Sequence, residues 1–529
     1  MEQLIGILMW IELILGLIQV IAQSLHCVHM LQLEGYHGDA YFVWCKEHLA
    51  SLFPLSRLFL IVSLLVFGIG SVFAGQTFKA VLLIICCIAT LIALLGCMPK
   101  KAKKPLVFTK RVQRMLLTYA ILIAILVLVF EHLGALSSAV WMPLTVLLLV
   151  LAVPAMVEFA NFINTPIEKA VAKHFIKDAE RILSEHKNLM VIGITGSYGK
   201  TSTKNFLHAL LSTQYNTLMT PASFNTTMGV VRAIRENLKP SHEVFICEMG
   251  AKGVGEIKEI CDIVHPQYGI LTSIGEQHLE TFLSLENIIK TKFELADAIP
   301  SDGFVCLNTD NPYIAGRPVS NTRSVSYGCE QASYHAENVE VSATGCKFTL
   351  VEPDGSRTGF TTKLLGAHNI QNIVGCLAMA RELGISAEKL VYPVRLLKPV
   401  SHRLELLPNG FIDDAFNSNP AGFRSALDVL KGFEGQRVLV TPGMVELGER
   451  EAPLNEELGR YAADCCDYAV LVGEKQAPPL KKGLLSAGYD ESRIYVAKSL
   501  DDGLKFVASL PNEGKRTVLL ENDLPDNYN

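Results

Sequence analysis

One stretch near residue 195 constrains the fold most, because it joins three structural signals in a fixed order. An apolar, β-branched run over 191–194 enters the loop Thr-Gly-Ser-Tyr-Gly-Lys-Thr at 195–201, and a helical pattern follows. This order predicts a strand that leads into a phosphate-binding loop, where backbone N–H groups and the helix dipole attract an anion. Lys200 is expected to neutralise phosphate charge, and Thr201 or Ser202 to offer a hydroxyl to Mg²⁺. A glycine-rich turn with an unrelated lysine is the alternative.

The part of the chain before about residue 160 is far more apolar than the rest. Half of the 529 residues are hydrophobic and the mean hydropathy is +0.31. Five apolar runs are long enough to cross a bilayer, which takes about 20 residues per crossing. They cover 4–23, 56–74, 79–98, 115–131 and 137–158. We therefore expect an α-helical transmembrane bundle over residues 1–165, with no ionisable side chain in the middle of a span.

Basic residues orient the predicted bundle. Lys and Arg crowd the loop at 100–114 and follow the fifth apolar run, whereas the loops at 71–78 and 132–138 have none. By the positive-inside rule the N-terminus lies outside and the chain after about residue 160 is cytoplasmic. The segment 26–55 is then expected at the cytoplasmic face, where its aromatic and polar residues suit an interfacial position.

Strand and helix patterns alternate after the loop, which predicts a parallel sheet with helices on both faces. Apolar strands end at Glu248, Thr272 and Asn308, so these side chains are expected at the carboxyl edge of the sheet, where ligands bind. Short strands are expected over 324–363. The alternation restarts near residue 400, which predicts a smaller Rossmann-like α/β domain. The expected divisions are a transmembrane module (1–165), a P-loop ATPase-like central domain (166–398) and a C-terminal domain (399–529).

Charge and cysteine usage argue against several classes of function. The formal net charge of −5 gives no indication of a nucleic-acid partner. The 13 cysteines are odd in number and form no Cys-x-x-Cys pair. This usage argues against a disulfide framework or a zinc site, and it favours a reducing compartment.

Further motifs follow the phosphate loop. They are Cys-Glu-Met-Gly-Ala at 247–251, His-Leu-Glu at 278–280, Lys-Thr-Lys-Phe-Glu at 290–294, Leu-Asn-Thr-Asp at 307–310, Ser-His-Arg-Leu-Glu at 401–405 and Asp-Asp-Ala-Phe-Asn-Ser-Asn-Pro at 413–420. Each alone is weak, because an acid at a strand end is often a helix cap and a lone histidine is usually structural. Together, in this order, they resemble the Mur ligase family over about 190–475. The last motif, with 442–448, is most similar to the branch that adds D-alanyl-D-alanine to UDP-N-acetylmuramoyl tripeptide.

The resemblance implies an ATP-dependent ligation of a carboxylate to an amine through an acyl phosphate, in peptidoglycan precursor synthesis. Such chemistry needs charge neutralisation, which lysine and two Mg²⁺ ions supply. The residues expected to carry it are Lys200, Glu248, His278 and Lys292. The implied ATP site comprises Gly196, Ser197, Gly199, Lys200, Thr201, Ser202, Asn308 (adenine), Arg403 (γ-phosphate) and Asp414 (ribose). The implied metal ligands are Thr201, Ser202, Glu248, His278 and a carbamylated Lys292. Asn225, Thr226, Asn417 and Asn419 are expected to face substrate.

Two departures from the family pattern leave the substrates open. Family members that use UDP-muramoyl substrates carry a uridine-binding domain before the phosphate loop, whereas only the charged, helix-like connector 166–187 precedes it here. The segment 519–526 also lacks the Lys-Gly-Ser-Arg that this branch usually shows. The first departure leaves the UDP-linked acceptor open, and the second leaves the added amine open.

The leading hypothesis is a membrane-anchored peptide ligase of a bacterial cell membrane, with cytoplasmic catalytic domains. It adds D-alanyl-D-alanine to a muramoyl-peptide stem, and its membrane module holds the acceptor. The alternatives are a ligase or amide synthase for a lipid-linked stem or a poly-amino-acid polymer, a nucleotide-driven transporter, and an inactive scaffold. No inverted repeat supports a transporter. The expected partners are a muramoyl-peptide or lipid-linked acceptor, an amino acid or dipeptide amine, and membrane lipid, but no nucleic acid.

Overall fold

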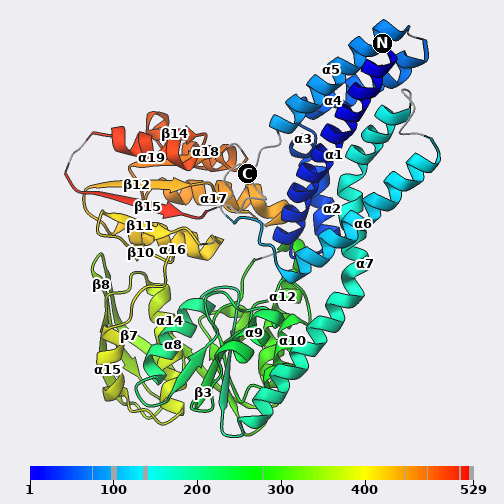
Figure 1. The fold of residues 1–529 in the computed structure, drawn as a ribbon. Helices are drawn as coiled ribbons and strands as arrows, with labels where there is room; N and C mark the ends of the chain where they lie inside the picture. The colour runs from blue at the N-terminus through cyan, green and yellow to red at the C-terminus, as the bar shows by residue number, and fades with distance from the viewer. Residues whose placement is uncertain are drawn as a thin grey trace. The chain divides into compact units, whose positions relative to one another are not determined.

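The computed structural model divides into two compact units, residues 1–173 and 174–524, and each is described by itself (Figure 1). The described residues are 1–73, 75–96, 104–134, 141–277, 279–416, 418–445, 447–473, 475–511 and 514–523.

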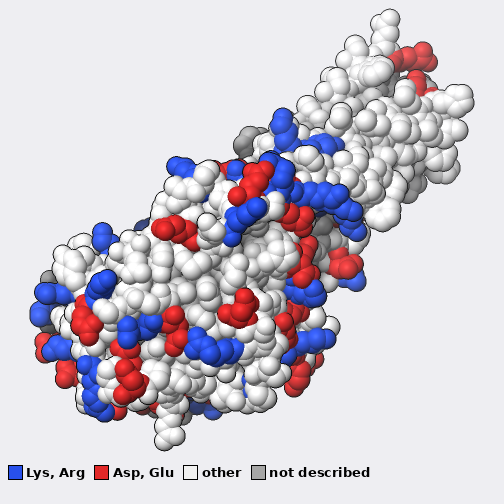
Figure 2. Space-filling view, turned by 90° about the horizontal axis from the view of Figure 1, so that it is seen from below, with Lys and Arg blue, Asp and Glu red and all other residues white. Residues whose placement is uncertain are grey.

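The described part of the first unit is helical. Its helices are α1 (Glu2–Leu33), α2 (Gly38–Glu47), α3 (Leu49–Leu52), α4 (Leu55–Phe73), α5 (Gln76–Leu95), α6 (Lys110–His132) and the first part of α7 (Trp141–Glu185). Five of them, α1, α4, α5, α6 and α7, are long and apolar enough to cross a membrane. The five apolar helices predicted from the sequence are therefore confirmed. Charged side chains are sparse over much of this unit's visible surface (Figure 2). The predicted helical connector at 166–187 is the end of α7.

The expectation of no ionisable side chain in the middle of a span is wrong. Glu12 lies within the first apolar run and is fully buried in the bundle. Its Oε1 accepts a hydrogen bond of 2.6 Å from the Thr90 hydroxyl of α5. A polar group between membrane helices needs such a partner, because lipid offers none.

The second unit begins with a nine-stranded sheet in the order β2-β3-β1-β4-β5-β6-β7-β8-β9. Its strands are β1 (Met190–Thr195), β2 (Thr217–Met219), β3 (Val244–Glu248), β4 (Tyr268–Leu271), β5 (Phe304–Asn308), β6 (Arg323–Gly328), β7 (Tyr334–Ser342), β8 (Gly345–Val351) and β9 (Arg357–Thr362). The pairs from β2 to β7 are parallel, and β7, β8 and β9 pair antiparallel. The strand ends predicted from the sequence lie at one edge of this sheet, because parallel strands end on the same side.

Helices cover both faces of this sheet. The helices are α8 (Lys200–Leu211), α9 (Thr227–Asn237), α10 (Glu256–Val264), α11 (Leu279–Phe282), α12 (Leu285–Ala298), α13 (Pro312–Ala315), α14 (Ala367–Glu382) and α15 (Ala387–Arg395). α8 and α14 pack into one core cluster. α9, α10, α12 and the last turns of α7 pack into the other, where Ala179 of α7 is fully buried.

A second sheet follows, in the order β10-β11-β15-β12-β13-β14. Its strands are β10 (Glu405–Leu406), β11 (Phe411–Asp414), β12 (Gln436–Thr441), β13 (Tyr468–Val472), β14 (Ile494–Ala497) and β15 (Arg516–Glu521), and its helices are α16 (Pro420–Lys431), α17 (Glu451–Ala462), α18 (Ala477–Ser486) and α19 (Leu500–Ser509). All neighbouring pairs except β10–β11 are parallel. The predicted fold class is confirmed: apolar helices, a central α/β domain and a smaller C-terminal α/β domain. The predicted boundaries at 165 and 398 stay predictions.

Candidate active site

The phosphate loop follows β1, which is the point where the strand order of the central sheet reverses. β1 has β3 on one side and β4 on the other, so the helices after these strands diverge and leave the carboxyl edge open. Two glycines let the loop turn there: Gly196 has φ 151° and Gly199 has φ 81°. A Cβ on Gly196 would lie 2.1 Å from the Thr272 hydroxyl, so the loop tolerates no larger residue at this position.

Lys200 is folded back over its own loop. Its Nζ donates hydrogen bonds to the carbonyl oxygens of Gly196, at 2.7 Å, and Ser197, at 3.0 Å. Burial lowers the pKa of Lys200 to about 8, and the charge of Arg403 acts in the same direction. A nearby negative charge would raise this pKa again, and the phosphate contact of Lys200 stays a prediction.

Glu248, at the end of β3, is the residue on which the site converges. Its Oε1 accepts hydrogen bonds of 3.0 Å from the Thr201 hydroxyl and from Asn225 Nδ2. Its Oε2 lies 3.0 Å from Lys204 Nζ, and both side chains are about 1% exposed. Burial alone raises the pKa of Glu248, but the charges of Lys204 and Lys200 outweigh it, and the net pKa lies below the usual value. The carboxylate is therefore ionised at neutral pH.

Lys204 is a site residue that the sequence analysis missed. It lies one turn after Lys200 on α8, and its Nζ also donates to the Ala222 carbonyl at 2.6 Å. A lysine on the apolar face of an amphipathic helix was the available signal, because such a position is buried only when an acid faces it. Its partner lies on another strand, so the sequence alone does not identify it.

The residues around Glu248 fit a divalent cation. The Thr201 hydroxyl and the Glu248 carboxylate offer neighbouring oxygen atoms, and hard cations such as Mg²⁺ prefer oxygen ligands. Ser202 is buried on the same turn of α8. Within the described part of the chain, no group of three or more His, Cys, Asp or Glu residues is gathered as a ready metal cluster. His278, one of the predicted ligands, lies outside the described residues.

Lys292 is buried on α12, with an exposed fraction of 3%. Its Nζ lies 5.7 Å from the centroid of the Phe282 ring. Burial, and after it the charge of Lys200, holds the pKa of Lys292 well below its usual range. Burial therefore favours the neutral amine, which is the form that reacts with carbon dioxide.

Asn308 ties the ends of two neighbouring strands together. It ends β5 and is 4% exposed, and its Nδ2 donates a hydrogen bond of 2.7 Å to the Thr272 carbonyl after β4. The Thr272 hydroxyl in turn donates to the Thr195 carbonyl at 3.2 Å. Asn308 is thus connected to the phosphate loop, but its adenine contact stays a prediction.

The C-terminal domain contributes Arg403 to this site. Arg403 Nη2 donates to the Thr201 hydroxyl at 3.3 Å, and the guanidinium lies 4.4 Å above the Phe416 ring. The structure therefore brings together Lys200, Thr201, Glu248 and Arg403, which were predicted to share one site although Thr201 and Arg403 are 202 residues apart.

Asp414 forms a buried acid pair with Glu521. The two residues are register partners on β11 and β15, and the Ser418 hydroxyl donates to Glu521 Oε1 at 2.6 Å. Asp414 Oδ1 accepts from the Leu404 N–H at 3.0 Å. Burial raises the pKa of Asp414 to about 6, and burial together with Asp414 raises that of Glu521 well above its usual value. The sequence analysis missed Glu521, although an acid that ends an apolar strand had already identified Glu248.

The predicted substrate-facing residues differ in what they do. Asn225 binds Glu248, as described above. Thr226 caps α9 by accepting from the Gly229 N–H at 3.3 Å, and Asn419 caps α16 by accepting from the Gly422 N–H at 2.8 Å. Both caps set where a helix begins. Their contact with substrate stays a prediction, and Asn417 lies outside the described residues.

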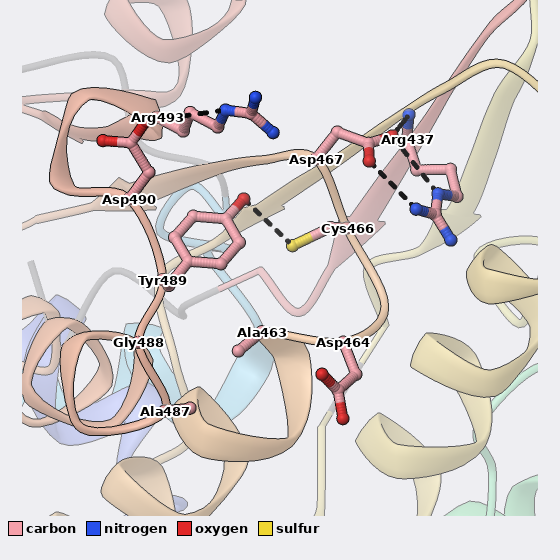
Figure 3. Close-up of a pocket in the computed structure, with 10 residues that line it drawn as sticks. All are labelled: Arg437, Ala463, Asp464, Cys466, Asp467, Ala487, Gly488, Tyr489, Asp490 and Arg493. Atoms are coloured by element: carbon pink, nitrogen blue, oxygen red, sulfur yellow. Dashed lines mark hydrogen bonds and ion pairs between the residues drawn. The ribbon is translucent and has the colours of Figure 1, made fainter.

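A surface pocket elsewhere in the C-terminal domain is not part of this site. It lies beside Arg437 and Asp467, which are bonded to each other, with Tyr489 and Arg493 opposite (Figure 3). Arg437 is at the start of β12 and Asp467 precedes β13. The pocket is therefore at the amino edge of the parallel strands, whereas Asp414 and Glu521 are at the carboxyl edge.

Two protein-family models match this chain. The Mur ligase middle domain matches residues 194–380, and the Mur ligase, glutamate ligase domain matches residues 402–520. These ranges contain most of both sheets and the site residues from Gly196 to Asp414, and the second range ends one residue before Glu521.

Curated relatives match the same part of the chain. The UDP-N-acetylmuramoyl-tripeptide–D-alanyl-D-alanine ligase of Escherichia coli is 32% identical over 332 residues, which are 60% of this chain and 73% of the relative. The Bacillus subtilis enzyme of the same name is 32% identical over 278 residues, which are 51% of this chain and 59% of the relative. The chain thus spans less than two thirds of the length of the second relative.

Solved structures give the same result. MurF from Acinetobacter baumannii is 27% identical, with a TM-score of 0.61 over 66% of this chain and 77% of that one. MurF ligase from Thermotoga maritima in complex with ADP is 25% identical, with a TM-score of 0.60 over 66% and 80%.

Proposed function

The chain belongs to the Mur ligase family, and we propose that it is an ATP-dependent, ADP-forming ligase that joins a carboxylate to an amine in peptidoglycan precursor synthesis. The observation that carries this proposal is the contact of Arg403 with Thr201, beside Lys200 and Glu248. This contact brings a cation from the C-terminal domain to the proposed phosphate-binding loop. Such convergence suits the transfer of a phosphoryl group between substrates held by two domains.

In the proposed reaction, a substrate carboxylate attacks the γ-phosphorus of ATP, forming an acyl phosphate and releasing ADP. The neutral amine of the second substrate then attacks the acyl carbon, and phosphate leaves as the amide forms. Lys200 and Arg403 neutralise the charge on the transferred phosphoryl oxygens. Gly196, Ser197 and Gly199 bring backbone N–H groups close to the anion. Asn308 and Asp414 hold the adenine and the ribose.

Two Mg²⁺ ions are proposed, and they supply charge neutralisation on the phosphates. Glu248, with Thr201 or Ser202, holds one of them. His278 and Lys292 hold the other, and for this Lys292 must be a carbamate. The neutral Lys292 amine attacks carbon dioxide, a nitrogen–carbon bond forms and a proton is released. The product offers oxygen atoms to a hard cation, whereas an ammonium would repel it.

The best single substrate pair is a muramoyl-peptide stem and D-alanyl-D-alanine, because the curated relatives are named for that pair. Five apolar helices support an enzyme anchored in a bacterial cell membrane with cytoplasmic catalytic domains. A lipid-linked stem is the second candidate acceptor, and the observation that favours it is the membrane-type unit on the same chain.

The test uses the full-length protein in lipid nanodiscs with ATP and Mg²⁺. UDP-linked and lipid-linked muramoyl tripeptides are each offered with D-alanyl-D-alanine or with single amino acids. We expect a product whose mass equals the sum of acceptor and amine minus water, with one ADP released per product. ATP hydrolysis that proceeds equally without any amine, and yields no ligated product, would contradict the proposal.

A further inference from the structure

Polar side chains from three helices lie at one end of the helical unit. Gln23 and His26 are one turn apart on α1, Trp44 is on α2, and Arg57 is in the first turn of α4. We call them the α1–α2–α4 cluster. Gln23 is fully buried, Arg57 is 3% exposed and Trp44 is 6% exposed. The first apolar run ends at about Gln23 and the second begins at about Arg57, so the cluster is at the headgroup level of the side that positive charge marks as cytoplasmic.

Ring contacts join His26 and Trp44 of the cluster. The His26 and Trp44 rings meet edge to face, with centroids 5.8 Å apart, and His48 stacks on the other side of Trp44 at 5.1 Å. Arg57 Nη1 donates to the Leu52 carbonyl, and its positive charge acts on His26. Leu52 and Trp44 belong to the same buried cluster of side chains. The polar groups are thus held in place by packing.

Several polar atoms of Gln23, His26 and Trp44 have no partner among the described residues. Across the part of the chain that the structure describes, no hydrogen bond reaches Gln23 Nε2, Gln23 Oε1, His26 Nε2 or Trp44 Nε1. Buried polar atoms are nearly always bonded in folded proteins, and each exception asks for an explanation. Four such atoms on neighbouring side chains indicate a place where a polar ligand binds.

The chemistry of the cluster selects an oxyanion. Trp44 Nε1 is only a donor, the Gln23 amide has two donors, and Arg57 carries a guanidinium that matches phosphate geometry. The first turn of α4 adds N–H groups and the positive end of its dipole. A cation would meet Arg57 at this position. We propose that the α1–α2–α4 cluster binds the phosphoryl oxygens of a diphosphate group, such as the headgroup of a lipid-linked acceptor.

This inference rests on the proposed function only for the identity of the ligand's source, since binding itself needs neither ATP nor an amine.

The protein contains its own fluorescent reporter of binding, Trp44. Its three tryptophans are Trp10, Trp44 and Trp141, and Trp10 and Trp141 are more than half exposed on the surface of the bundle. The double substitution Trp10→Phe and Trp141→Phe therefore leaves Trp44 as the single emitter without disturbing the core.

The experiment titrates farnesyl diphosphate into the full-length single-tryptophan protein in nanodiscs and follows Trp44 emission. We expect a saturable change. Gln23→Leu, which keeps the side-chain volume, and Arg57→Gln are expected to weaken binding by about tenfold or more. Arg57→Lys keeps the charge and is expected to retain part of the affinity. Lys46→Gln, which removes an exposed charge from α2, is the matched control and should change binding by no more than about twofold.

Three further arms identify the source of the diphosphate. Inorganic pyrophosphate, UDP and farnesyl monophosphate are titrated in the same way. If pyrophosphate or UDP also gives a saturable response, the cluster recognises the diphosphate alone. If farnesyl diphosphate is the one compound that gives a response, the cluster also requires the lipid chain. No saturable response to any of them, or equal affinity of wild type, Gln23→Leu and Arg57→Gln, overturns the inference. ATP turnover measured on Gln23→Leu stays at the wild-type rate even then, so the proposed function is tested separately.

Discussion

Two lysines one turn apart on α8 have opposite tasks. Lys200 Nζ contacts only backbone carbonyls of its own loop among its described hydrogen bonds, whereas Lys204 neutralises the buried Glu248. The ion pair assigns Lys204 to the fold, whereas Lys200 is proposed to bind a ligand. Lys204 is about 1% exposed and Lys200 is only partly buried.

This contrast gives the first prediction. Lys200→Ala should lower ATP turnover by about 10²–10³-fold, the loss expected when one preorganised charge contact disappears, and should leave the melting temperature unchanged. Lys204→Met should instead lower the free energy of unfolding by about 3–5 kcal/mol, because it leaves Glu248 buried without its ion-pair partner. The measurements are phosphate release and chemical denaturation of both variants. Near-normal turnover by Lys200→Ala would remove the loop from the nucleotide site.

Lys292 gives the second prediction. Lys292→Ala should lose ligation, and short carboxylates such as acetate should restore part of it, because they replace the carbamate oxygens. Lys290→Ala, on the exposed face of the same helix, is the control and should stay active without any additive. Activity is measured with and without acetate, and again after removal of bicarbonate. If neither treatment affects the enzyme, Lys292 is a buried structural lysine.

The acid pair of Asp414 and Glu521 gives a third prediction, on pH. The folded pKa of Asp414 is about 6 against an ordinary value of 3.8, and that of Glu521 is also raised. The stabilisation that these protons give is therefore complete below about pH 4 and lost as the pH rises through about 6. Arg403 and Asp413 also face Asp414 and act in opposite directions.

Glu521→Gln should remove much of this dependence. The melting temperature of the wild type should fall between about pH 5 and pH 8 by more than that of Glu521→Gln. Glu434→Gln, at an exposed position of the same domain, should behave as the wild type does. Equal slopes for all three proteins would show that the pair does not share protons in the folded state.

At the scale of helices and strands, the sequence predicts what is local. The apolar runs, the strand that ends at Glu248 and the restart of the pattern near residue 400 each depend on neighbours in the chain, and the structure has them. What the sequence did not predict depends on packing between distant elements. Lys204 and Glu521 are site residues only because β3 and β11 bring an acid to each, and Glu12 is tolerated in α1 because α5 offers Thr90.

The last turns of α7 show that packing against neighbouring elements determines what a helix does in the fold. Phe175 and Ala179 pack against α9, and Arg235 of α9 both pairs with Asp178, at 2.7 Å, and lies 4.2 Å above the Phe175 ring. α9 begins at Thr227, directly after the loop that carries Asn225. These turns of α7 therefore support the segment that binds Glu248.

The fourth prediction tests that support. Ala179→Asp places an unpaired charge at a fully buried position and should lower the stability of the second unit by several kcal/mol. Lys177→Asp places the same side chain at an exposed position of the same helix and should have little effect. The read-out is the reactivity of the buried cysteines of the second unit with a thiol dye during heating. Equal melting of both variants would show that α7 is only a connector there.

On the scale of the whole molecule, two parts are combined in one chain: two α/β domains that carry the proposed ligase site, and a bundle of apolar helices. The family models match 194–380 and 402–520, and neither includes the bundle. Nothing in the proposed chemistry at Lys200, Glu248 and Arg403 needs the bundle. Its contribution must then lie in where the enzyme works or in how it obtains its acceptor.

The last prediction separates these two roles. A fragment that begins at residue 166 retains every described residue of the proposed active site, so it should ligate a soluble UDP-linked muramoyl peptide with the kcat/KM of the full-length enzyme. For a lipid-linked acceptor in nanodiscs, the fragment should lose about tenfold or more in kcat/KM, because a second binding site on the same chain raises the effective acceptor concentration. Gln23→Leu in the full-length chain should reproduce that loss for the lipid-linked acceptor only, since it leaves both α/β domains intact. If the fragment processes the two acceptors as well as the full-length enzyme does, the helices serve only as an anchor.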